Sequence, residues 1–330
     1  MIGPAELRRI AVRTAESSVV VVGDVMLDEF VWGSVSRISP DAPVPVVLKE
    51  HRSCRLSGAL IAARVARALS GRVTAVGVVG DDGPGGRLLR LTAEAGIDDG
   101  ILVDPARPTT VKTRVYAQGQ QLLRMDDEST EPVGGVLAHS LTDAVLELLE
   151  EADVLVLSDY RKGVLTADVA KRLINAGRAH GIPVVVDTKR ADAERFRGAT
   201  IMTPNALEMA AMADSLWAGH LDFADRATHI IGHYDLSALL VTQDRDGMTL
   251  VSRDGASLSV SALPVDSPNA AGAGDAVVGA LAACLAAEVP LGTALDVARL
   301  AACCLIRQQG TLAVSLEALT DLAAAETELV

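Results

Sequence analysis

The chain is poor in aromatic side chains and in positive charge. Aromatic residues make up 2% of its 330 residues although hydrophobic residues make up 49%, so Ala, Val and Leu must fill the core. Single-stranded nucleic acids bind on aromatic stacking platforms, which this composition hardly supplies. Lys and Arg number 30 against 43 Asp and Glu, a formal net charge of −13, which disfavours nonspecific binding to nucleic acid or anionic membranes. We therefore expect an anionic ligand to be held by local basic residues and backbone amides.

Cysteines are few, and no apolar run is long. The four cysteines (Cys54, Cys284, Cys303 and Cys304) form no C-x-x-C pair, which favours buried free thiols over a redox site. The apolar run 276–287 is too short to span a bilayer and is followed by Glu288. Residues 1–16 indicate a short amphipathic helix and not a signal peptide. We expect a soluble, cytoplasmic protein.

Several signatures of common enzyme classes are missing. No G-x-x-x-x-G-K-[ST] loop occurs, and Gly23-Asp24-Val25-Met26 after the first strand lacks the glycine pattern of a dinucleotide fold. The chain also has no H-E-x-x-H and no G-x-S-x-G, which argues against zinc proteases and α/β-hydrolases. His229 and His233 have the spacing to share a metal, but no third ligand is evident, which favours two solvent-exposed histidines.

Short β-branched runs alternate with Ala- and Leu-rich stretches along most of the chain. Continuous apolar strands that alternate with helices are typical of a doubly wound, mostly parallel α/β sheet covered on both faces. The expected strands are 19–22, 73–79, 154–157, 184–186, 200–203 and 239–242, and the expected helices are 58–69, 85–95, 136–150, 167–180, 205–213, 222–234 and 276–287.

Polar residues follow many of these strands. Ligands of parallel sheets bind at the carboxyl ends of the strands, so we expect these residues to line one cleft. They are Asp24, Ser158-Asp159, Asp187, Thr203-Pro204-Asn205 and Thr242.

Two segments, 28–50 and 108–127, break the alternation with β-rich, extended sequence, and the first contains Pro40, Pro43 and Pro45. Neither supports a helix. We interpret them as strands of a small accessory sheet that acts as a lid over the cleft. Two surface hairpins with no gating role are the alternative. Because no repeat or flexible linker occurs, we expect one domain over 1–330, with the lid inserted in it.

The sequence Ala271-Gly272-Ala273-Gly274-Asp275 precedes the apolar helix 276–287. Glycines permit close backbone approach to a ligand, and amides at a helix start point toward bound anions. Asp275 would repel a phosphate there unless it took a proton from a hydroxyl that attacks the phosphoryl group. A simple helix start with Asp275 in the first turn is the equally supported alternative.

Several motifs together resemble one enzyme family. Gly272-Ala273-Gly274-Asp275, Asn205-x-x-Glu208 and Val21-Val22-Gly23-Asp24 are similar to those of ribokinase-like (PfkB) carbohydrate kinases. Longer matches resemble the D-glycero-β-D-manno-heptose-7-phosphate kinase branch over about 18–316, at residues 21–28, 36–47, 120–126, 157–163 and 236–242. The resemblance implies a ribokinase-like fold, ATP, Mg²⁺, a sugar-phosphate substrate and a homodimer through the lid. An adenylyltransferase domain follows in many members, and we expect that activity to be absent here.

The resemblance also implies a role for each matching residue. Asp275 would be the base acting on an anomeric hydroxyl, and the amides of Gly272, Ala273 and Gly274 would form an anion hole. Asn205 and Glu208 would organise Mg²⁺ through water. The implied ATP contacts are Lys189, Asn205, Glu208, Thr242 and Gly247. The implied substrate contacts are Asp28, Arg37, Gly58, Lys112, Arg114 and Arg124, and a solvated sheet face is the alternative for the lid cations.

The chain departs from the family pattern in three places. Ser57-Gly58-Ala59-Leu60-Ile61 replaces Gly-Gly-Ala-x-Asn, so a hydrocarbon stands where an amide would bind sugar hydroxyls. Asn269-Ala270-Ala271 replaces Asp-[Val/Thr]-Thr, and Arg299 stands where an Asn is expected near the adenine. The first hypothesis is an ATP-dependent kinase that converts a heptose 7-phosphate to the 1,7-bisphosphate or acts on a related sugar phosphate. The alternatives are a kinase-like binding protein with lost or altered catalysis and a PfkB kinase for another small molecule.

Overall fold

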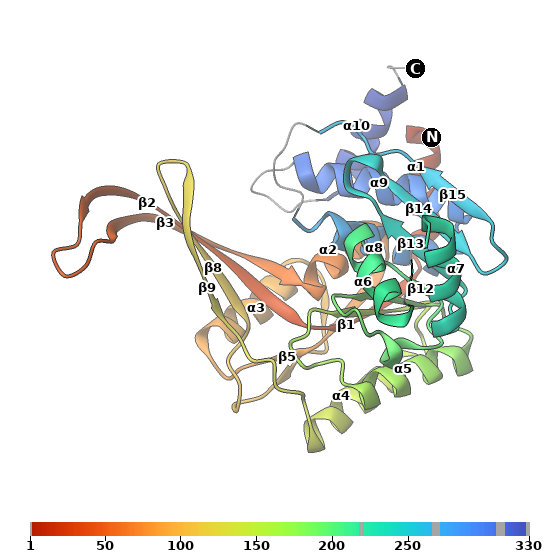
Figure 1. The fold of residues 1–330 in the computed structure, drawn as a ribbon, viewed down its shortest axis with the longest axis horizontal. Helices are drawn as coiled ribbons and strands as arrows, with labels where there is room; N and C mark the ends of the chain where they lie inside the picture. The colour runs from red at the N-terminus through yellow and green to blue at the C-terminus, as the bar shows by residue number, and fades with distance from the viewer. Residues whose placement is uncertain (1, 218, 220, 266–270, 308–313, 328–330) are drawn as a thin grey trace.

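The computed structural model describes residues 2–217, 219, 221–265, 271–307 and 314–327, and its centre is a nine-stranded sheet (Figure 1). Neighbouring strands run parallel from β13 to β6, whereas β14 and β15 add an antiparallel edge. The spatial order is β15 (Ser257–Val260), β14 (Met248–Ser252), β13 (Ala238–Thr242), β12 (Ile201–Met202), β11 (Val184–Thr188), β10 (Val154–Asp159), β1 (Ser18–Gly23), β4 (Arg72–Val76) and β6 (Asp98–Asp99). The predicted doubly wound, mostly parallel sheet is confirmed.

Helices cover both faces of this sheet because its strands carry apolar side chains on both sides. Val19 and Val21 of β1 join one buried cluster, and Val20 and Val22 join the other, as the two-residue period of a strand requires. The first cluster includes α1 (Pro4–Thr14), α2 (Ala59–Leu69), α3 (Gly83–Glu94), α8 (Ala273–Ala286), α9 (Leu291–Arg307) and α10 (Leu316–Thr327). The second includes α4 (Gly135–Leu148), α5 (Ala167–His180), α6 (Ala206–Leu216) and α7 (Phe223–Tyr234).

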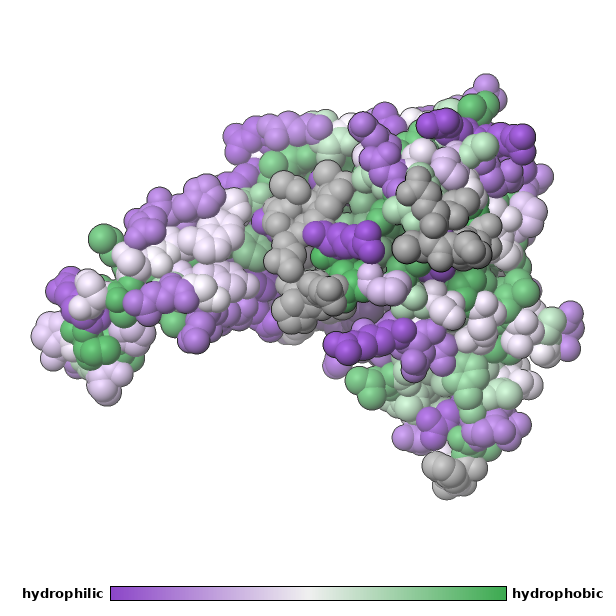
Figure 2. Space-filling model, turned by 90° about the horizontal axis from the view of Figure 1, so that it is seen from above, coloured by the Kyte–Doolittle hydropathy of each residue, from purple (hydrophilic) through white to green (hydrophobic). Residues whose placement is uncertain are grey.

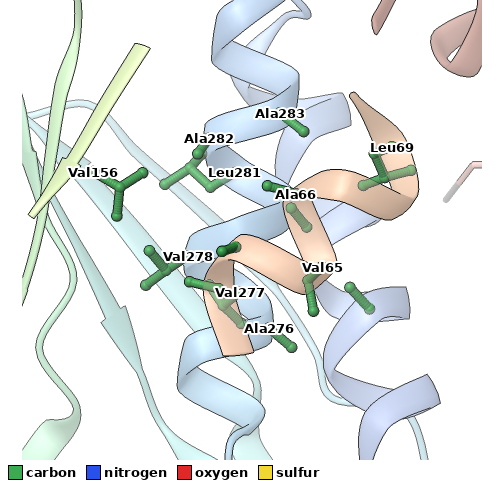
Figure 3. Packing of buried hydrophobic residues seen from close by; sticks show 14 of the residues in the cluster. Val65, Ala66, Leu69, Val156, Ala276, Val277, Val278, Leu281, Ala282 and Ala283 are labelled. Atoms are coloured by element: carbon green, nitrogen blue, oxygen red, sulfur yellow. The ribbon is translucent and has the colours of Figure 1, made fainter. Parts of the chain in front are cut away.

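Helices α2 and α8 approach each other very closely (Figure 3). A Cβ atom on Gly279 would lie 2.3 Å from the carbonyl oxygen of Ala62, so only glycine permits this approach. Figure 3 shows small side chains, among them Ala66 and Ala276, filling the space between the helices. This packing fixes the beginning of α8 beside the beginning of α2.

A separate four-stranded sheet projects from the body (Figures 1 and 2). Its order is β3 (Pro45–Gly58), β2 (Val25–Ile38), β8 (Val111–Ala117) and β9 (Gln120–Asp127). The predicted accessory sheet is therefore present, and we call it the lid. β2 begins two residues after β1 ends, and β3 leads directly into α2. The lid therefore joins the body next to β1 and α2.

The structure corrects several predicted boundaries. The strand predicted over 73–79 is broken at Gly77, where a Cβ atom would lie 2.8 Å from the carbonyl oxygen of Gly23. Its second part is β5 (Val78–Val79), which pairs with β7 (Leu102–Val103). Helix α8 begins at Ala273, three residues before the predicted start. The β14–β15 hairpin, α9, α10 and the short 3₁₀ helices η1 (Glu194–Phe196) and η2 (Asp244–Asp246) were not predicted. No helix in the described ranges is long and apolar enough to cross a membrane.

Candidate active site

A cavity of about 660 Å³ lies where β11, β12 and β13 end. Its lining includes polar residues that follow these strands, namely Asp187, Thr203, Asn205 and Thr242, together with 272–275. The prediction that strand-end residues share one cleft is correct for this group. It is wrong for four others, which are not among the lining residues: Asp24, Ser158, Asp159 and Pro204.

Asp24 and Asp159 are instead buried structural groups. Asp24 accepts hydrogen bonds from the backbone N–H groups of Tyr160, Lys162 and Val164, which fixes the loop after β10. Burial nevertheless raises the pKa of Asp24 to about 6. Asp159 accepts from the Arg190 guanidinium at 2.5 Å. Together these contacts hold Tyr160 in place beside the cavity.

Asp275 lies in the first turn of α8, where its side chain is buried. The hydroxyl of Tyr160 donates a hydrogen bond to Asp275 Oδ1. Burial, followed by the nearby negative charge of Asp187, raises the pKa of Asp275 to about 7, while the Tyr160 hydrogen bond and Lys189 lower it. A carboxyl group with such a pKa can accept a proton near neutral pH and release it again.

The backbone before Asp275 forms a helix start that is open to a ligand. Gly272 is the N-cap of α8 with φ +85°, a left-handed conformation that favours glycine, and no side chain caps the helix. The first amides of a helix lack intrahelical acceptors and carry the positive end of its dipole. A Cβ atom on Gly274 would meet none of the described residues within 4 Å, which leaves room beside these amides in that part of the chain. Gly272, Ala273 and Gly274 all line the cavity.

A cationic and acidic network lies opposite this helix start. Lys189 Nζ lies 3.2 Å from Asp187 Oδ1 and 3.3 Å from Glu208 Oε1. Burial alone would lower the pKa of Lys189, but these two carboxylates outweigh it and raise that pKa. Glu208 also forms a capping box with Asn205, since each side chain accepts a hydrogen bond from the other's backbone N–H. The predicted Asn205/Glu208 pair is therefore held rigidly at the cavity wall.

Asp187 is the residue of this network that the sequence did not assign to a role. Its Oδ2 atom is buried and has no hydrogen-bond partner among the described residues, and its pKa is raised by burial. An unsatisfied carboxylate oxygen is costly in a closed protein, and a cation bound at the cavity wall would satisfy it. No group of three His, Cys, Asp or Glu side chains in the described chain could hold a metal alone. Asp187 and Glu208 thus fit Mg²⁺, which binds one or two carboxylates together with waters and substrate phosphates.

The histidine pair on α7 contacts other protein groups. His229 Nδ1 hydrogen-bonds to the carbonyl of Asp225, and His233 Nε2 lies 3.3 Å from Glu194. Both rings also contact the edge of Trp217. Both side chains are half-buried, whereas the sequence favoured two solvent-exposed histidines.

Three further positions that the sequence analysis named also line the cavity. Thr242 and Gly247 line it, and Gly247 has φ +98° at the turn into β14. Arg299 also lines it, but its guanidinium is buried against Glu326 at 2.6 Å and Asp296 at 3.3 Å. The charge of Arg299 is therefore compensated within the protein.

The predicted substrate residues lie mostly on the lid. The cationic side chains of Lys112, Arg114 and Arg124 are in salt bridges with acidic residues. Arg114 Nη1 donates to Asp28 at 2.7 Å, Lys112 pairs with Asp126 and Glu128, and Arg124 pairs with Asp126. Gly58 adopts φ +63° before α2, where a Cβ atom would lie 2.3 Å from the carbonyl oxygen of Asp24. Arg37 lies nine residues beyond Asp28 on β2, roughly 30 Å away along an extended strand. The structure does not bring Arg37 to the cavity of its own chain.

The substituted positions lie next to the helix start. A Cβ atom on Gly272 would lie 3.4 Å from Cδ1 of Ile61, so Ile61 packs under the amides of α8. Asn269 and Ala270 lie outside the described residues. Tyr160 was inside a matched stretch but received no role. Its position directly after a buried strand, in a chain with only three tyrosines, is the signal that could have found it.

Comparison with known proteins assigns this arrangement to a family. A sequence profile described as pfkB family carbohydrate kinase matches residues 16–319. The chain belongs to the pfkB family of carbohydrate kinases. Two relatives of this pfkB kinase are both called bifunctional protein HldE. The one from Bradyrhizobium diazoefficiens is 42% identical over 90% of this chain and 61% of its own length, and the one from Paramagnetospirillum magneticum is 42% identical over 89% and 60%. The chain thus spans about three-fifths of the length of these curated relatives.

Solved structures share the fold of this pfkB kinase. Phosphofructokinase-2 from Escherichia coli in complex with fructose-6-phosphate has a TM-score of 0.72 at 19% identity, over 95% of this chain and 99% of the other. Arabidopsis thaliana ribokinase complexed with ribose and ATP has a TM-score of 0.73 at 17% identity, over 94% and 99%. These likenesses confirm the ribokinase-like fold, and membership of the family makes the chain an ATP-dependent carbohydrate kinase.

Proposed function

We propose that this kinase transfers the γ-phosphoryl group of ATP to the anomeric hydroxyl of a heptose 7-phosphate or a closely related sugar phosphate. The observation that carries the proposal is Asp275, a buried carboxyl group with a pKa of about 7 beside the open amides of α8. The lid motifs that resemble the heptose-7-phosphate kinase branch support the choice of substrate. The HldE name of the relatives is compatible with that branch.

In this proposal, one residue acts on the acceptor hydroxyl and the others bind the phosphoryl group and the nucleotide. Asp275 orients the acceptor hydroxyl and takes its proton as the oxygen attacks phosphorus. The amides of Gly272, Ala273 and Gly274 stabilise the negative charge on the oxygens in transfer. Lys189, held between two carboxylates, neutralises charge on the nucleotide phosphates. Thr242 and Gly247 would contact the nucleotide on the same wall.

Mg²⁺ would be held by Asp187 and Glu208, with Asn205 fixing the geometry of Glu208, and when bound it supplies charge neutralisation to the phosphates. The lid would exclude water from the acceptor. We also propose a cytoplasmic location, since the donor is ATP and all four cysteines are free thiols.

The lid supports a second proposal, a homodimer in which a second copy packs on this sheet. Six of the exposed large apolar side chains in the described chain are on it: Ile38, Val44, Leu48, Leu122, Leu123 and Met125. Figure 2 shows apolar residues at its free end. Exposed apolar patches of this kind mark interaction surfaces.

An ADP-release assay with MgATP tests the proposed function. D-glycero-D-manno-heptose 7-phosphate is compared with the same sugar without its phosphate and with hexose and pentose phosphates. We expect turnover on the heptose 7-phosphate, with kcat/KM well above that of the other sugars. Turnover on another sugar alone would contradict the assignment and would point to Ser57 and Ile61 as the cause.

One observation favours a kinase-like protein with lost or altered catalysis as the second candidate. Ile61 is buried and packs under Gly272, so a hydrocarbon lies where the family pattern has an amide. Loss of one hydrogen bond to a sugar hydroxyl costs about 1–3 kcal/mol, which retunes specificity more readily than it abolishes chemistry. ATP binding by calorimetry, together with no turnover across the sugar panel, would establish this candidate.

A further inference from the structure

The lid cations that the sequence assigns to a substrate phosphate leave little free positive charge. Lys112, Arg114 and Arg124 each contact at least one carboxylate within 3.1 Å. Glu128 is shared further with Lys162 at 2.7 Å. A phosphate at these residues would compete with bonded carboxylates, and the local charge around it would be close to zero. A phosphate on the acceptor would therefore need other cations.

Arg55 and Arg64 differ from all of these residues. Neither has a carboxylate within salt-bridge distance or a hydrogen-bond acceptor anywhere in the described residues, although both are only partly exposed. The Arg55 guanidinium carbon lies 4.5 Å from the centre of the Phe30 ring. Burial lowers the pKa of Arg64, and the nearby charge of Arg55 lowers it further. Each guanidinium group is partly desolvated, and its five N–H donors have no acceptor among the described residues. An anion bound between the two groups would stabilise them.

The position of the pair places it on the acceptor side of Asp275. Arg55 is opposite Asp28 in the β2–β3 register, so both side chains lie on one face of the lid. Arg64 is in the second turn of α2, and helical side chains point back toward the helix start, here toward Ile61 and the Gly272 loop. Neither arginine lines the cavity that contains Lys189, Thr242 and Asp275. They lie on β3 and α2, the consecutive elements that join the lid to the body.

We propose that Arg55 and Arg64 form the subsite for the phosphate monoester that the acceptor sugar already carries. The inference rests on the proposed function, because it places the far end of a sugar phosphate whose hydroxyl is at Asp275. Guanidinium groups bind phosphate oxygens through paired hydrogen bonds, and a dianion compensates two like charges at once. Lys112, Arg114 and Arg124 then serve mainly to hold the lid strands and Asp28.

Calorimetric binding of the full chain without nucleotide tests the subsite. Heptose 7-phosphate and the same heptose without phosphate are titrated into wild type, Arg64→Met, Arg64→Lys and the control Arg172→Met. Arg172 lies on α5 and forms a 3.4 Å ion pair with Asp143 of α4, so the control makes the same charge change elsewhere. We expect Arg64→Met to weaken binding of the sugar phosphate about ten- to hundredfold and to leave binding of the plain sugar and of ATP unchanged.

Arg64→Lys should fall between wild type and Arg64→Met, because it keeps the charge but loses the paired donors. Unchanged binding of the sugar phosphate in Arg64→Met, or equal losses for both sugars, would overturn the subsite. The ADP-release assay separates this outcome from failure of the proposed function. Wild type that binds the sugar phosphate without turnover contradicts the function and leaves the subsite test intact. Wild type that binds no sugar phosphate overturns both.

Discussion

At the scale of single residues, Asp275 carries the proposed chemistry. Asp275→Asn keeps the shape of the side chain and its place beside Tyr160 but removes the proton acceptor. General base catalysis contributes about 10²–10⁴-fold, so we expect kcat to fall by at least a hundredfold. ATP affinity by calorimetry and the circular dichroism spectrum should stay as in wild type. Turnover within a few-fold of wild type would remove Asp275 from the role of base.

The pH dependence of the reaction provides a second test at this scale. Asp275 must be ionised to accept a proton, so kcat/KM should rise as pH rises through about 7 and fall below it. The groups around it are Tyr160 after β10, Asp187 and Lys189 at the end of β11, and Glu208 on α6, which reaches it through Lys189.

Tyr160→Phe removes a hydrogen bond that lowers the pKa of Asp275. The pKa should therefore rise, and the acid limb of kcat/KM should move to higher pH, while the rates of variant and wild type converge above the limb. Tyr116→Phe is the control, since its hydroxyl donates a hydrogen bond to Gln121 on the lid. A uniform loss of rate with no movement of the limb would mean that Tyr160 acts only through packing.

At the scale of elements, the α2–α8 contact sets the position of the amides that begin α8. Gly279→Ala would place a Cβ atom 2.3 Å from the carbonyl oxygen of Ala62, a backbone atom that cannot move without its helix. We expect a loss of about 1–3 kcal/mol in the free energy of unfolding, measured with urea, and a lower kcat as the helices separate.

Gly292→Ala is the matched control for this helix contact. Gly292 is in α9, and a Cβ atom there would meet nothing within 4 Å. The free energy of unfolding should stay the same or rise by up to about 1 kcal/mol, because alanine restricts the unfolded chain. Equal effects of the two substitutions would contradict a special role for the Gly279 contact.

The sequence predicted these elements well where a local pattern determines them. Apolar runs located the central strands, and the helix predicted over 205–213 is α6. Asn205 and Glu208, which the resemblance assigned to Mg²⁺, form the capping box at its start. Pairing and charge compensation were not predictable, because they depend on residues distant in sequence. Asp28, the partner of Arg114, lies 86 residues away along the chain, and Glu326, one of the partners of Arg299, lies 27 residues away. For the same reason, only the fold shows that Asp187 Oδ2 and the Arg64 guanidinium lack partners among the described residues.

At the scale of the whole molecule, the lid links the acceptor site of one chain to the surface on which we propose that a second copy packs. The β2–β8 pairing ends at Gly33, opposite Ala117, whereas β2 and β3 continue outward beyond it. That outer part holds the exposed side chains of Ile38, Val44 and Leu48. It contributes nothing to Asp28, Arg55 or Arg114, so the proposed dimer contact and the acceptor site can be separated by mutation.

Replacing residues 34–48 with Asn-Gly would join Gly33 to Lys49, which already face each other in the register. Asn-Gly favours the tight turn that suits a two-residue hairpin, so the shortened lid should keep its pairing with β8. Wild type should have twice the 34.3 kDa mass of the chain by light scattering at micromolar concentration, and the shortened variant should have the mass of one chain. A dimeric variant would place the interface elsewhere, and a monomeric wild type would refute the dimer. Because the truncation spares Arg64, unchanged binding of heptose 7-phosphate by the monomer would further show that one chain forms the complete acceptor site.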